Sequence, residues 1–445
     1  MRHFTKLGLL IFLGTALSLP AATTVTNLFA GSLQSFLVRS DGSLWAAGAN
    51  SDGQLGSGNY NTTYRFIQVR TNFASFVATG GNHTLLLNQD GSLAVTGDDS
   101  YGDLGDGGSN PVNAFKGLLI IPSGVMRIAA GVNHSMFVKN NGSLWGMGLN
   151  TQAQLGDGTL NNTNRPEQIV PNNVANVSCG SSATFFVQSN GFVLGMGLLN
   201  NFRYDLNVYT PQPVLFGGAS TVVCGAQHAL IIGTNGALLA FGANAAGELG
   251  DGTTNQSISP EQILTNGVIA AACGASHSHF IKSDGSLWAM GLNNHGELGD
   301  GTTNNSLVPE EIVSNSVVAV AAGLGHCLFL KSDGSVWATG LDSASQFGDG
   351  FTNLSILTPQ QVYPAPAPAL TNIIAGISSL QFTARCALGG TYYLLATTNL
   401  AQPASQWTRV ATNSIGDRYN DLFFATLTNA ITAGAPQEFY QLQSP

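Results

Sequence analysis

Short apolar runs alternate with polar, Gly-rich turns along most of the chain, and the whole pattern returns about every 49 residues. The unit from Val317 to Val362 contains all of its parts, in the order VVAVAAG, HCLFLKSDGSVWATG, LDSASQFGDG and PQQV. A fixed period of about 20 to 50 residues is typical of repeat proteins, in which each repeat is one supersecondary unit. The hydropathy pattern therefore indicates a repeat architecture before any single residue is considered.

A turn that contains glycine separates two β-type apolar runs in each unit. Asp-Gly or Asn-Gly in this setting predicts a two-residue hairpin connection, because glycine supplies the positive φ that the turn needs. The dipeptide occurs at seven equivalent places, at residues 41–42, 90–91, 141–142, 190–191, 235–236, 284–285 and 333–334. We therefore expect a β-hairpin in every unit.

Two further strands are expected in each unit. A run of small residues precedes each hairpin and would let strands crowd together where several sheets converge on an axis. A proline-led run such as RPEQIV or SPEQIL closes most units, and proline belongs at a strand start or a sheet edge. Four-stranded units could stack as an open solenoid or close as a ring. The end units keep the apolar runs of the middle ones, which favours an all-β, seven-bladed β-propeller over residues 24–362.

Both ends of the chain differ from the repeat. Arg2 and Lys6 precede the apolar run LGLLIFLGTALSL, which is shorter than the roughly 20 residues that span a bilayer. Residues 1–22 are therefore expected to be a cleaved signal peptide, with a membrane anchor as the competing interpretation. Residues 363–370 (YPAPAPAL) predict a semi-rigid linker. Residues 371–445 have another β pattern and resemble a small β-sandwich module of secreted proteins.

Composition and charge narrow the function classes. Only 9% of the residues are charged and 55 are glycine, which argues against a helical or disordered chain. The net charge of −9 argues against nucleic acid as a partner, because such binding needs clustered Lys and Arg. We expect an exported monomer without a membrane span after signal cleavage, located outside the cell or in the cell envelope, that is, the periplasm or outer surface.

Three of the five cysteines hold one position of the repeat. They are Cys179, Cys224 and Cys273, and other units have Ala30, Thr79, Ala130 and Ala322 there. A position that accepts Ala, Thr or Cys predicts a small buried site, so we interpret these thiols as packing residues rather than as a disulfide framework. Cys327 and Cys386 are isolated, and the odd total leaves a thiol unpaired within a monomer.

Histidine, aspartate and tryptophan also recur once per unit. The positions are His83, His134, His228, His277 and His326; Asp106, Asp157, Asp251, Asp300 and Asp349; and Trp45, Trp145, Trp288 and Trp337. Residues repeated once per blade lie on a ring of sheets about 10 Å apart, too far for ligands that must lie about 2 Å from one zinc ion. We expect neutral histidines bonded to a neighbouring loop, aspartates that cap their own loops, and tryptophans that pack between blades.

Two local groups have a composition that metals use. His277, His279 and His295 precede Glu297 and Asp300 in the sixth unit. In the second unit, the aspartates at 98, 99, 103 and 106 loosely resemble a calcium loop without matching its twelve-residue pattern. We interpret the first group as a chance cluster, keep calcium as an open alternative for the second, and expect no resident metal or cofactor.

Departures from the repeat are the candidate binding residues, because the scaffold does not require them. The fourth unit replaces the Gly-rich segment by LLNNFRYDLNVYTP, and the first contains further aromatics. The candidates are Phe202, Arg203, Tyr204, Tyr209, Tyr60, Tyr64 and Arg65. Tyr and Arg are enriched in binding hot spots. The alternative is a shorter loop that packs its own aromatic side chains.

The run from His277 to Thr302, HSHFIKSDGSLWAMGLNNHGELGDGT, resembles the repeat of the regulator of chromosome condensation (RCC1) family. The resemblance covers about three quarters of the chain and implies a seven-bladed propeller. The eukaryotic founding member is a nuclear exchange factor for a small GTPase, whereas this chain is acidic and begins with an expected leader. In setting it is closer to exported bacterial propellers such as β-lactamase inhibitory protein II, which binds a protein through loops on one face.

We therefore expect a non-enzymatic scaffold that binds a protein or glycan partner through loops on one propeller face. One alternative is an enzyme, a lyase or a glycan hydrolase, with its site in the axial funnel. Another is a structural cell-surface protein that is attached through its C-terminal module.

Overall fold

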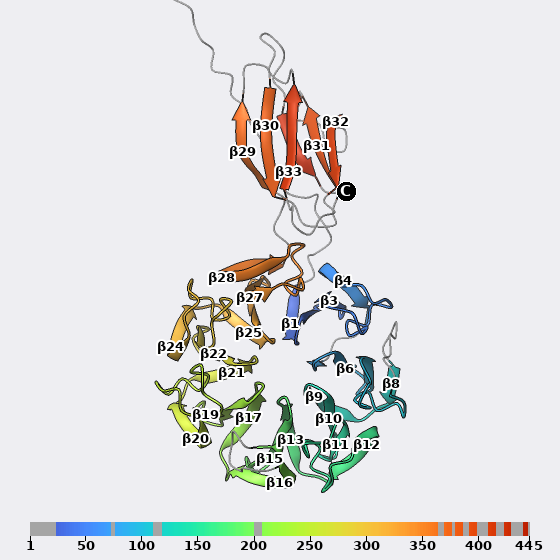
Figure 1. Cartoon of the computed structure of the whole chain (residues 1–445), viewed down its shortest axis with the longest axis vertical. Helices are drawn as coiled ribbons and strands as arrows, with labels where there is room; N and C mark the ends of the chain where they lie inside the picture. The colour runs from blue at the N-terminus through green and yellow to red at the C-terminus, as the bar shows by residue number, and fades with distance from the viewer. Residues whose placement is uncertain are drawn as a thin grey trace, which may run out of the picture. The chain divides into compact units, whose positions relative to one another are not determined.

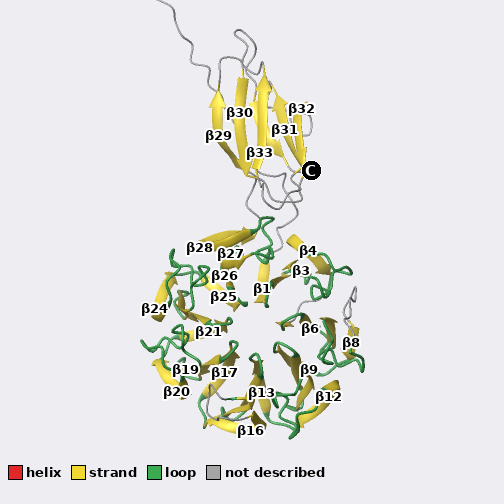
Figure 2. Ribbon diagram, in the orientation of Figure 1, coloured by secondary structure: helices red, strands yellow, loops and turns green. Residues whose placement is uncertain are grey.

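The computed structural model describes residues 24–72, 76–109, 118–199 and 207–363, and six strands beyond them. Seven four-stranded antiparallel sheets surround a central axis (Figure 1). The described residues contain strands and loops and no helix (Figure 2), so none of them forms a helix that could cross a membrane. The predicted all-β, seven-bladed propeller is confirmed.

Each blade consists of four strands that are consecutive in the sequence, and the first lies nearest the axis (Figure 1). Blades 1 to 3 contain β1 (Val25–Ala30), β2 (Gln34–Arg39), β3 (Leu44–Gly48), β4 (Thr63–Arg70), β5 (Phe76–Thr79), β6 (His83–Leu87), β7 (Leu93–Gly97), β8 (Leu118–Ile121), β9 (Val125–Ala130), β10 (His134–Lys139), β11 (Leu144–Gly148) and β12 (Thr163–Val170). Blades 4 and 5 contain β13 (Val174–Cys179), β14 (Ala183–Gln188), β15 (Val193–Leu198), β16 (Asn207–Leu215), β17 (Ala219–Cys224), β18 (His228–Gly233), β19 (Leu238–Gly242) and β20 (Ser257–Leu264). Blades 6 and 7 contain β21 (Val268–Cys273), β22 (His277–Lys282), β23 (Leu287–Gly291), β24 (Ser306–Val313), β25 (Val317–Ala322), β26 (His326–Lys331), β27 (Val336–Asp342) and β28 (Asn353–Tyr363).

The hairpin between the second and third strands is one residue longer than predicted. In blade 1, Gly42 N donates to Arg39 O at 2.9 Å and Arg39 N donates to Ser43 O at 3.0 Å, so three residues make the reversal. Only the glycine has a positive φ, of 77°. Asp41 instead accepts a hydrogen bond from Ser43 N at 2.9 Å, which is an Asx turn. A three-residue loop that ends in left-handed glycine is the next most common hairpin connection.

The hydrophobic core lies between neighbouring blades rather than at one centre. Leu85 and Val95 of blade 2 pack with Ile128 and Phe137 of blade 3 in one buried cluster. Because burying apolar area is worth about 25 cal/mol per Å², each blade depends on its neighbour for stability. This arrangement explains why every unit repeats the same apolar runs.

The same kind of cluster closes the ring. Leu28 and Leu37 of blade 1 are buried with Leu328 and Val336 of blade 7. Blades 1 and 7 each consist of their own four consecutive strands, so no strand is exchanged to join the ends. The propeller is closed by side-chain packing and by the hydrogen bonds between blades described below.

Glycine after the first strand permits the close approach of blades at the axis. A Cβ atom on Gly131 would overlap the imidazole of His134 and would lie 2.7 Å from Gly180 O in the next blade. The equivalent glycines are Gly31, Gly80, Gly180, Gly225, Gly274 and Gly323. The expected crowding of small residues around an axis is thus observed.

Residues 365–445 belong to a second compact unit. One three-stranded antiparallel sheet contains β29 (Ala369–Ala375), β30 (Ser379–Arg385) and β33 (Leu422–Thr428), and another contains β32 (Thr408–Ser414), β31 (Thr391–Thr397) and β34 (Phe439–Gln443). The β-sandwich interpretation of this unit remains a prediction. The expected signal peptide, residues 1–22, lies outside the described residues.

Candidate functional site

Strand direction gives the propeller two different ends. The turn between the first and second strands and the long segment between the third and fourth strands lie at one end, which we call the loop face. The Asp-Gly and Asn-Gly hairpins lie at the other end, which we call the turn face. The loop face therefore carries most of the irregular backbone of each blade, and loops on a rigid scaffold commonly carry function.

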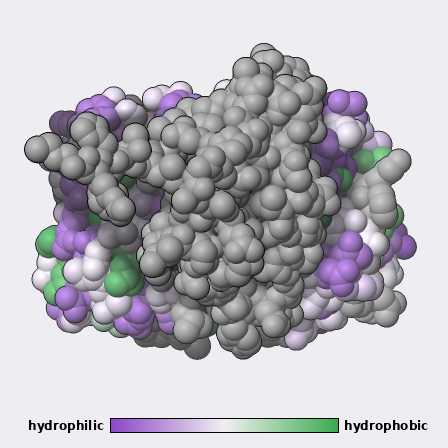
Figure 3. Space-filling view, turned by 90° about the horizontal axis from the view of Figure 1, so that it is seen from above, coloured by the Kyte–Doolittle hydropathy of each residue, from purple (hydrophilic) through white to green (hydrophobic). Residues whose placement is uncertain are grey.

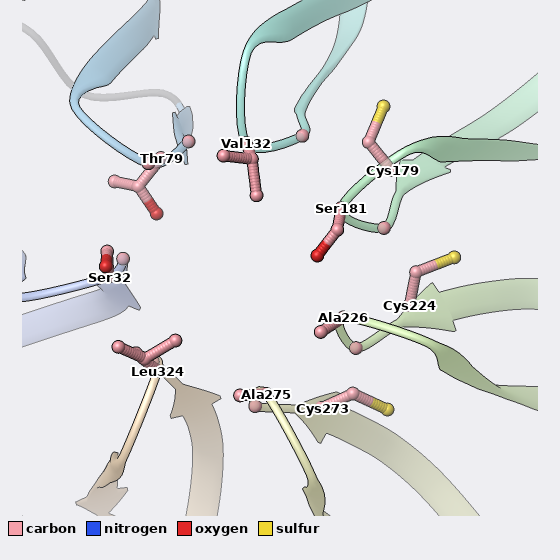
Figure 4. A pocket seen from close by; sticks show the side chains of 18 of the residues that line it. Ser32, Thr79, Val132, Cys179, Ser181, Cys224, Ala226, Cys273, Ala275 and Leu324 are labelled. Atoms are coloured by element: carbon pink, nitrogen blue, oxygen red, sulfur yellow. The ribbon is translucent and has the colours of Figure 1, made fainter. Parts of the chain in front are cut away.

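A cavity of about 280 Å³ lies on the axis at the loop-face ends of the first strands. Three residues of each blade line it, and Figure 4 shows the residues after the glycines, such as Ser32, Ser181 and Leu324, closest to its centre. The lining consists of Ala, Gly, Ser, Thr, Val, Leu and Cys. The cavity can receive a small apolar group, but its described lining contains no carboxylate, imidazole or ammonium group for acid–base chemistry.

The three cysteines of the repeat lie at the edge of this cavity but do not offer it a reactive group. The sulfur atoms of Cys179, Cys224 and Cys273 point away from its centre (Figure 4). Burial raises the pKa of Cys224 to about 12, and it also raises the pKa values of Cys179 and Cys273. All three are free thiols, so the packing interpretation fits. Cys179 and Cys224 are only half-buried as whole residues, because their backbone faces the cavity.

Backbone hydrogen bonds join neighbouring blades around the cavity. The bonds are Gly81 N to Val132 O (3.1 Å), Ser181 N to Ala226 O (3.0 Å), Ala226 N to Ala275 O (3.3 Å), Ala275 N to Leu324 O (3.3 Å) and Leu324 N to Gly31 O (3.2 Å). The last bond joins blade 7 to blade 1. The mouth of the cavity is consequently a rigid part of the ring.

The repeated histidines are buried, and all of them reach the next blade except His277, whose ring has no hydrogen-bond partner among the described residues. Four of them lie close to a hydroxyl through Nε2: His83 to Ser135 (3.0 Å), His134 to Thr184 (2.9 Å), His228 to Ser278 (2.9 Å) and His326 to Ser35 (3.1 Å). The expectation of a neutral, structural imidazole at a strand start agrees with this geometry. The partner is a side chain on a strand, however, and not the neighbouring loop that we predicted.

The hydroxyl partners fix the direction of these bonds. Ser135 Oγ donates to Asp103 O at 2.7 Å and Thr184 Oγ1 donates to Gln154 O at 2.8 Å. Because each hydroxyl has one proton, it must accept from the imidazole, which places the histidine proton on Nε2. Burial lowers the pKa of His134 to about 3, which keeps this ring neutral.

Blade 2 adds a carboxylate to this arrangement. Asp103 Oδ2 lies 3.2 Å from His83 Nδ1, and His83 Nε2 in turn contacts Ser135. The connectivity is that of a nucleophilic triad. All three side chains are at most 1% exposed, and the serine proton is already bonded to a backbone carbonyl. This trio therefore holds two blades together and has no access to a substrate.

The two metal-like groups are not assembled as metal sites. His277 and His279 are buried with their rings 5.4 Å apart, whereas the exposed His295 contacts Ser355 Oγ at 3.4 Å. Glu297 accepts from His295 N at 2.7 Å. Across the described part of the chain, no three His, Cys, Asp or Glu side chains are placed to hold a metal ion, including the aspartates at 98, 99, 103 and 106.

The long loops of blades 3, 5 and 6 are held by hydrogen bonds that the sequence only partly showed. Asp157 accepts from Thr159 N at 2.8 Å, which confirms its predicted capping role. The buried Asn150 was not singled out, yet its Nδ2 donates to Asp157 at 2.9 Å and its Oδ1 accepts from Leu155 N at 3.0 Å. Gly158 N then donates to Tyr209 O of the next blade at 2.9 Å. Each such loop is thus tied to itself and to its neighbour.

The tryptophans pack between blades as predicted, and they also meet cations. Trp145 packs against the cluster that joins blades 2 and 3, and it stacks on Phe137 at 6.1 Å. The Lys139 ammonium lies 4.2 Å from its ring centroid, a cation–π contact of about 0.5–1 kcal/mol. The same contact occurs at Trp45, Trp288 and Trp337. A ligand-stacking role would require displacing these cations.

The predicted binding residues fall on two separate blades. Tyr60 is 53% exposed in the long loop of blade 1, where Arg65 is also exposed and Tyr64 is half-buried on β4. Tyr209 is 44% exposed on β16 of blade 4. Blades 1 and 4 are not neighbours (Figure 1), so these two groups do not form one patch. Phe202, Arg203 and Tyr204 lie outside the described residues.

The structure reveals further exposed side chains on the same face. Six blades each present at least one exposed apolar residue on the long loop or near the start of the fourth strand: Tyr60, Tyr101, Leu160, Tyr209, Ile258 and Val308, with Leu118 and Leu119 in addition on blade 2. Val132 and Leu324 are exposed beside the cavity. These positions vary in a repeat that is otherwise regular, which is the signal that could have identified them. In Figure 3, the coloured surface of the propeller shows small hydrophilic and hydrophobic areas beside each other.

Seven blades of four consecutive strands, closed without strand exchange around a narrow axial cavity, define a repeat-type β-propeller. The model of the RCC1-like domain matches residues 117–398, which is more than half of the chain, and the model of the regulator of chromosome condensation (RCC1) repeat matches residues 41–87. The chain therefore belongs to the RCC1-like domain family.

Solved structures of the same fold are similar at low sequence identity. Human WBSCR16 is 23% identical over 70% of this chain and 88% of its own, with a TM-score of 0.62. Prp20p from Saccharomyces cerevisiae is 18% identical over 79% of this chain and 90% of its own, with a TM-score of 0.63. Yeast RCC1 (Prp20) bound to Kap60 gives 18% identity, 82% and 94% coverage and a TM-score of 0.64. At these identities the likeness establishes the fold alone.

Proposed function

We propose that this chain is a non-enzymatic, exported binding scaffold that recognises a protein partner through its loop face. The observation that carries the proposal is the set of exposed apolar side chains on the long loops and fourth strands of blades 1 to 6. Loops on a rigid scaffold commonly carry binding residues, and tyrosine is enriched among the residues that dominate binding energy. A glycan partner is the second candidate, because Tyr60, Tyr101 and Tyr209 are exposed aromatic groups.

Rigidity of the loop face supports this function. The long loops of blades 3, 5 and 6 are held by capping aspartates and by hydrogen bonds to the next blade, such as Gly252 N to Leu307 O at 2.8 Å. A surface that is ordered before binding loses little conformational entropy in the complex. Propellers of this family are known to bind proteins in solved structures: yeast RCC1 (Prp20) was solved bound to Kap60, and Prp20p is described with binding to Gsp1p and histones.

The chemistry of the axial cavity argues against the enzyme alternative. Its described lining has no group that titrates near neutral pH, and the repeated histidines are buried between blades. An acid–base enzyme needs groups within hydrogen-bond reach of its substrate. The cavity instead suits a single small apolar side chain of a partner.

The proposal is tested by changing one face at a time. A loop-face variant carries Tyr101→Ser, Leu160→Ser and Ile258→Ser, and its matched control carries Phe216→Ser, Ile269→Ser and Val318→Ser, which are exposed outside the loop face. Affinity capture from secreted and envelope fractions should recover a saturable partner with the wild type and the control and lose it with the loop-face variant. Equal capture by both variants would contradict the proposal.

Two further arms separate the remaining alternatives. If free oligosaccharides compete with capture, the partner is a glycan. If deletion of residues 363–445 releases the protein from cells while capture is unchanged, the C-terminal module attaches it, as the structural alternative holds. Phe202, Arg203 and Tyr204 remain predicted contacts, and a triple alanine variant at these positions tests them in the same assay.

A further inference from the structure

One buried position of blade 2 differs from its equivalents in blades 3, 5 and 6. In blades 3, 5 and 6, a buried asparagine begins the long loop and its Nδ2 donates to an aspartate of the same loop. The pairs are Asn150 with Asp157 (2.9 Å), Asn244 with Asp251 (3.0 Å) and Asn293 with Asp300 (2.9 Å). In blade 3 the same nitrogen also donates to Thr159 O at 3.2 Å. The amide nitrogen is thus a donor surrounded by acceptor oxygens.

Blade 2 has Asp99 where those blades have asparagine. Asp99 is 0% exposed, and its Oδ1 accepts from Leu104 N at 2.8 Å, as the asparagine oxygen does elsewhere. Its Oδ2 takes the place of the amide nitrogen, and within the described residues no donor reaches it. Asp106 stands seven residues after Asp99, as Asp157 stands seven residues after its hydrogen-bond partner Asn150, and it interacts with the Asp99 side chain. Asp106 itself is exposed, so the buried Asp99 oxygen is the group that needs a proton or a cation to compensate its charge.

The surroundings favour a proton. A carboxyl–carboxylate hydrogen bond joins two oxygens about 2.5–2.7 Å apart, whereas calcium needs about six to eight oxygens at about 2.3–2.6 Å from the ion. Among the described side chains, no group of three acids, histidines or cysteines could supply such a shell. The site therefore suits a proton rather than a calcium ion.

The charged groups around this pair leave it short of positive charge. Asp103 is nearby on the same loop, and its carboxylate is in contact with His83 of β6 at 3.2 Å. Asp98 also lies close enough to act on His83 and Asp103. Across the blade boundary, the Arg165 guanidinium packs against Gly107. Neither the Arg165 guanidinium nor another described donor bonds Asp99 Oδ2.

We propose that Asp99 and Asp106 bind one shared proton, and that this proton keeps the long loop of blade 2 closed against blade 3. The closed loop is joined to β12 by Gly107 N to Asn164 O at 2.8 Å and by Asn164 Nδ2 to Gly107 O at 3.0 Å. Loss of the proton leaves an uncompensated buried charge on Asp99 beside the carboxylate of Asp106, and the loop must then open towards water.

The direction of the pH dependence follows from the burial. Burial, with the negative charges of Asp106 and Asp103, raises the pKa of Asp99 from 3.8 to about 7. A group whose pKa is higher in the folded state stabilises the fold fully when the pH lies below its pKa in the unfolded state. This contribution is lost as the pH rises through its pKa in the folded state. Loop closure should therefore weaken about tenfold per pH unit between about pH 4 and pH 7, and become independent of pH above that range.

Hydrogen exchange of the intact chain, expressed as protection factors, tests the proposal. Protection of the amides of residues 103–108 should fall as the pH rises from about 4 to about 7 in the wild type, with the tenfold slope given above, and should level off between about pH 8 and pH 9. Asp99→Asn restores the amide of the other blades and should make this protection independent of pH. Asn150→Asp is the matched variant and should install the same pH dependence at residues 154–159 of blade 3. A local measurement is needed because Asp342 has the same position in blade 7.

Three outcomes would overturn the proposal. The first is flat protection in the wild type over this pH range, and the second is an unchanged pH dependence in the Asp99→Asn variant. The third uses calcium chloride as the probe: if calcium restores protection at high pH in the wild type but not in Asp99→Asn, the site holds a cation and not a proton.

Discussion

His228 of blade 5 and Ser278 of blade 6 meet at 2.9 Å, between the imidazole Nε2 and the hydroxyl, although 50 residues separate them in the chain. The equivalent residues between blades 4 and 5 are Ala183 and Ala229, so both members of the pair are absent together. Leaving one buried polar partner without the other is costly. This relationship explains why the repeat tolerates alanine at both positions of a boundary.

The pairing predicts non-additive effects of mutation. His228→Ala and Ser278→Ala should each destabilise the protein by about 1–3 kcal/mol, because each removes a buried hydrogen-bond partner. The double variant reproduces the natural alanine pair. Its destabilisation should be about 1 kcal/mol smaller than the sum of the two single effects. Thermal unfolding of the four proteins measures the coupling. Strict additivity would show that the bond contributes nothing.

The buried histidines predict loss of stability in acid. Burial lowers the pKa values of His134, His228 and His326 to about 3, from an unfolded value of about 6.5. The unfolded chain therefore binds these protons first, so their contribution is present above about pH 6.5 and is lost as the pH falls towards 3. The melting temperature should fall steadily between these limits. The His228→Ala, Ser278→Ala double variant should show a shallower fall, and an equal slope would contradict the assignment.

The glycines at the axis should resist substitution. Gly131→Ala places a methyl group against the His134 ring and 2.7 Å from Gly180 O, and overpacking of this kind costs about 1–3 kcal/mol. Gly267→Asn is a matched control, because nothing lies within 4 Å of its Cβ position and asparagine tolerates the positive φ of 88°. Chemical denaturation should show a clear loss for the first variant and a small one for the second. A reversed order would show that the axis is not crowded.

The cysteines should be inert in the folded protein. Burial raises the pKa of Cys224 to about 12, and because only the thiolate reacts, the thiols at 179, 224, 273 and 327 should resist alkylation at about pH 8. Unfolding in guanidinium should expose all of them to rapid labelling, which mass spectrometry can count. Labelling of Cys179 or Cys224 in the native protein would mean that the axial cavity admits the reagent to sulfur.

Local signals in the sequence were sufficient to predict the blades. The spacing of Asp-Gly and Asn-Gly, the apolar runs and the proline-led strands depend on backbone conformation within one unit, and the structure has seven such units. The hairpin length was wrong because the Asp41 side chain bonds Ser43 N at 2.9 Å and so makes an Asx turn that a dipeptide rule does not include.

Contacts between units were decided only by the tertiary structure. The sequence does not tell which hydroxyl meets each histidine, that Leu324 N bonds Gly31 O at 3.2 Å to close the ring, or that the His83, Asp103 and Ser135 trio is sealed from solvent. Each of these facts joins residues from different blades, and their separation is set by the curvature of the ring. Periodicity determines what one blade is, whereas the packing of seven blades determines which of its side chains remain accessible to a partner.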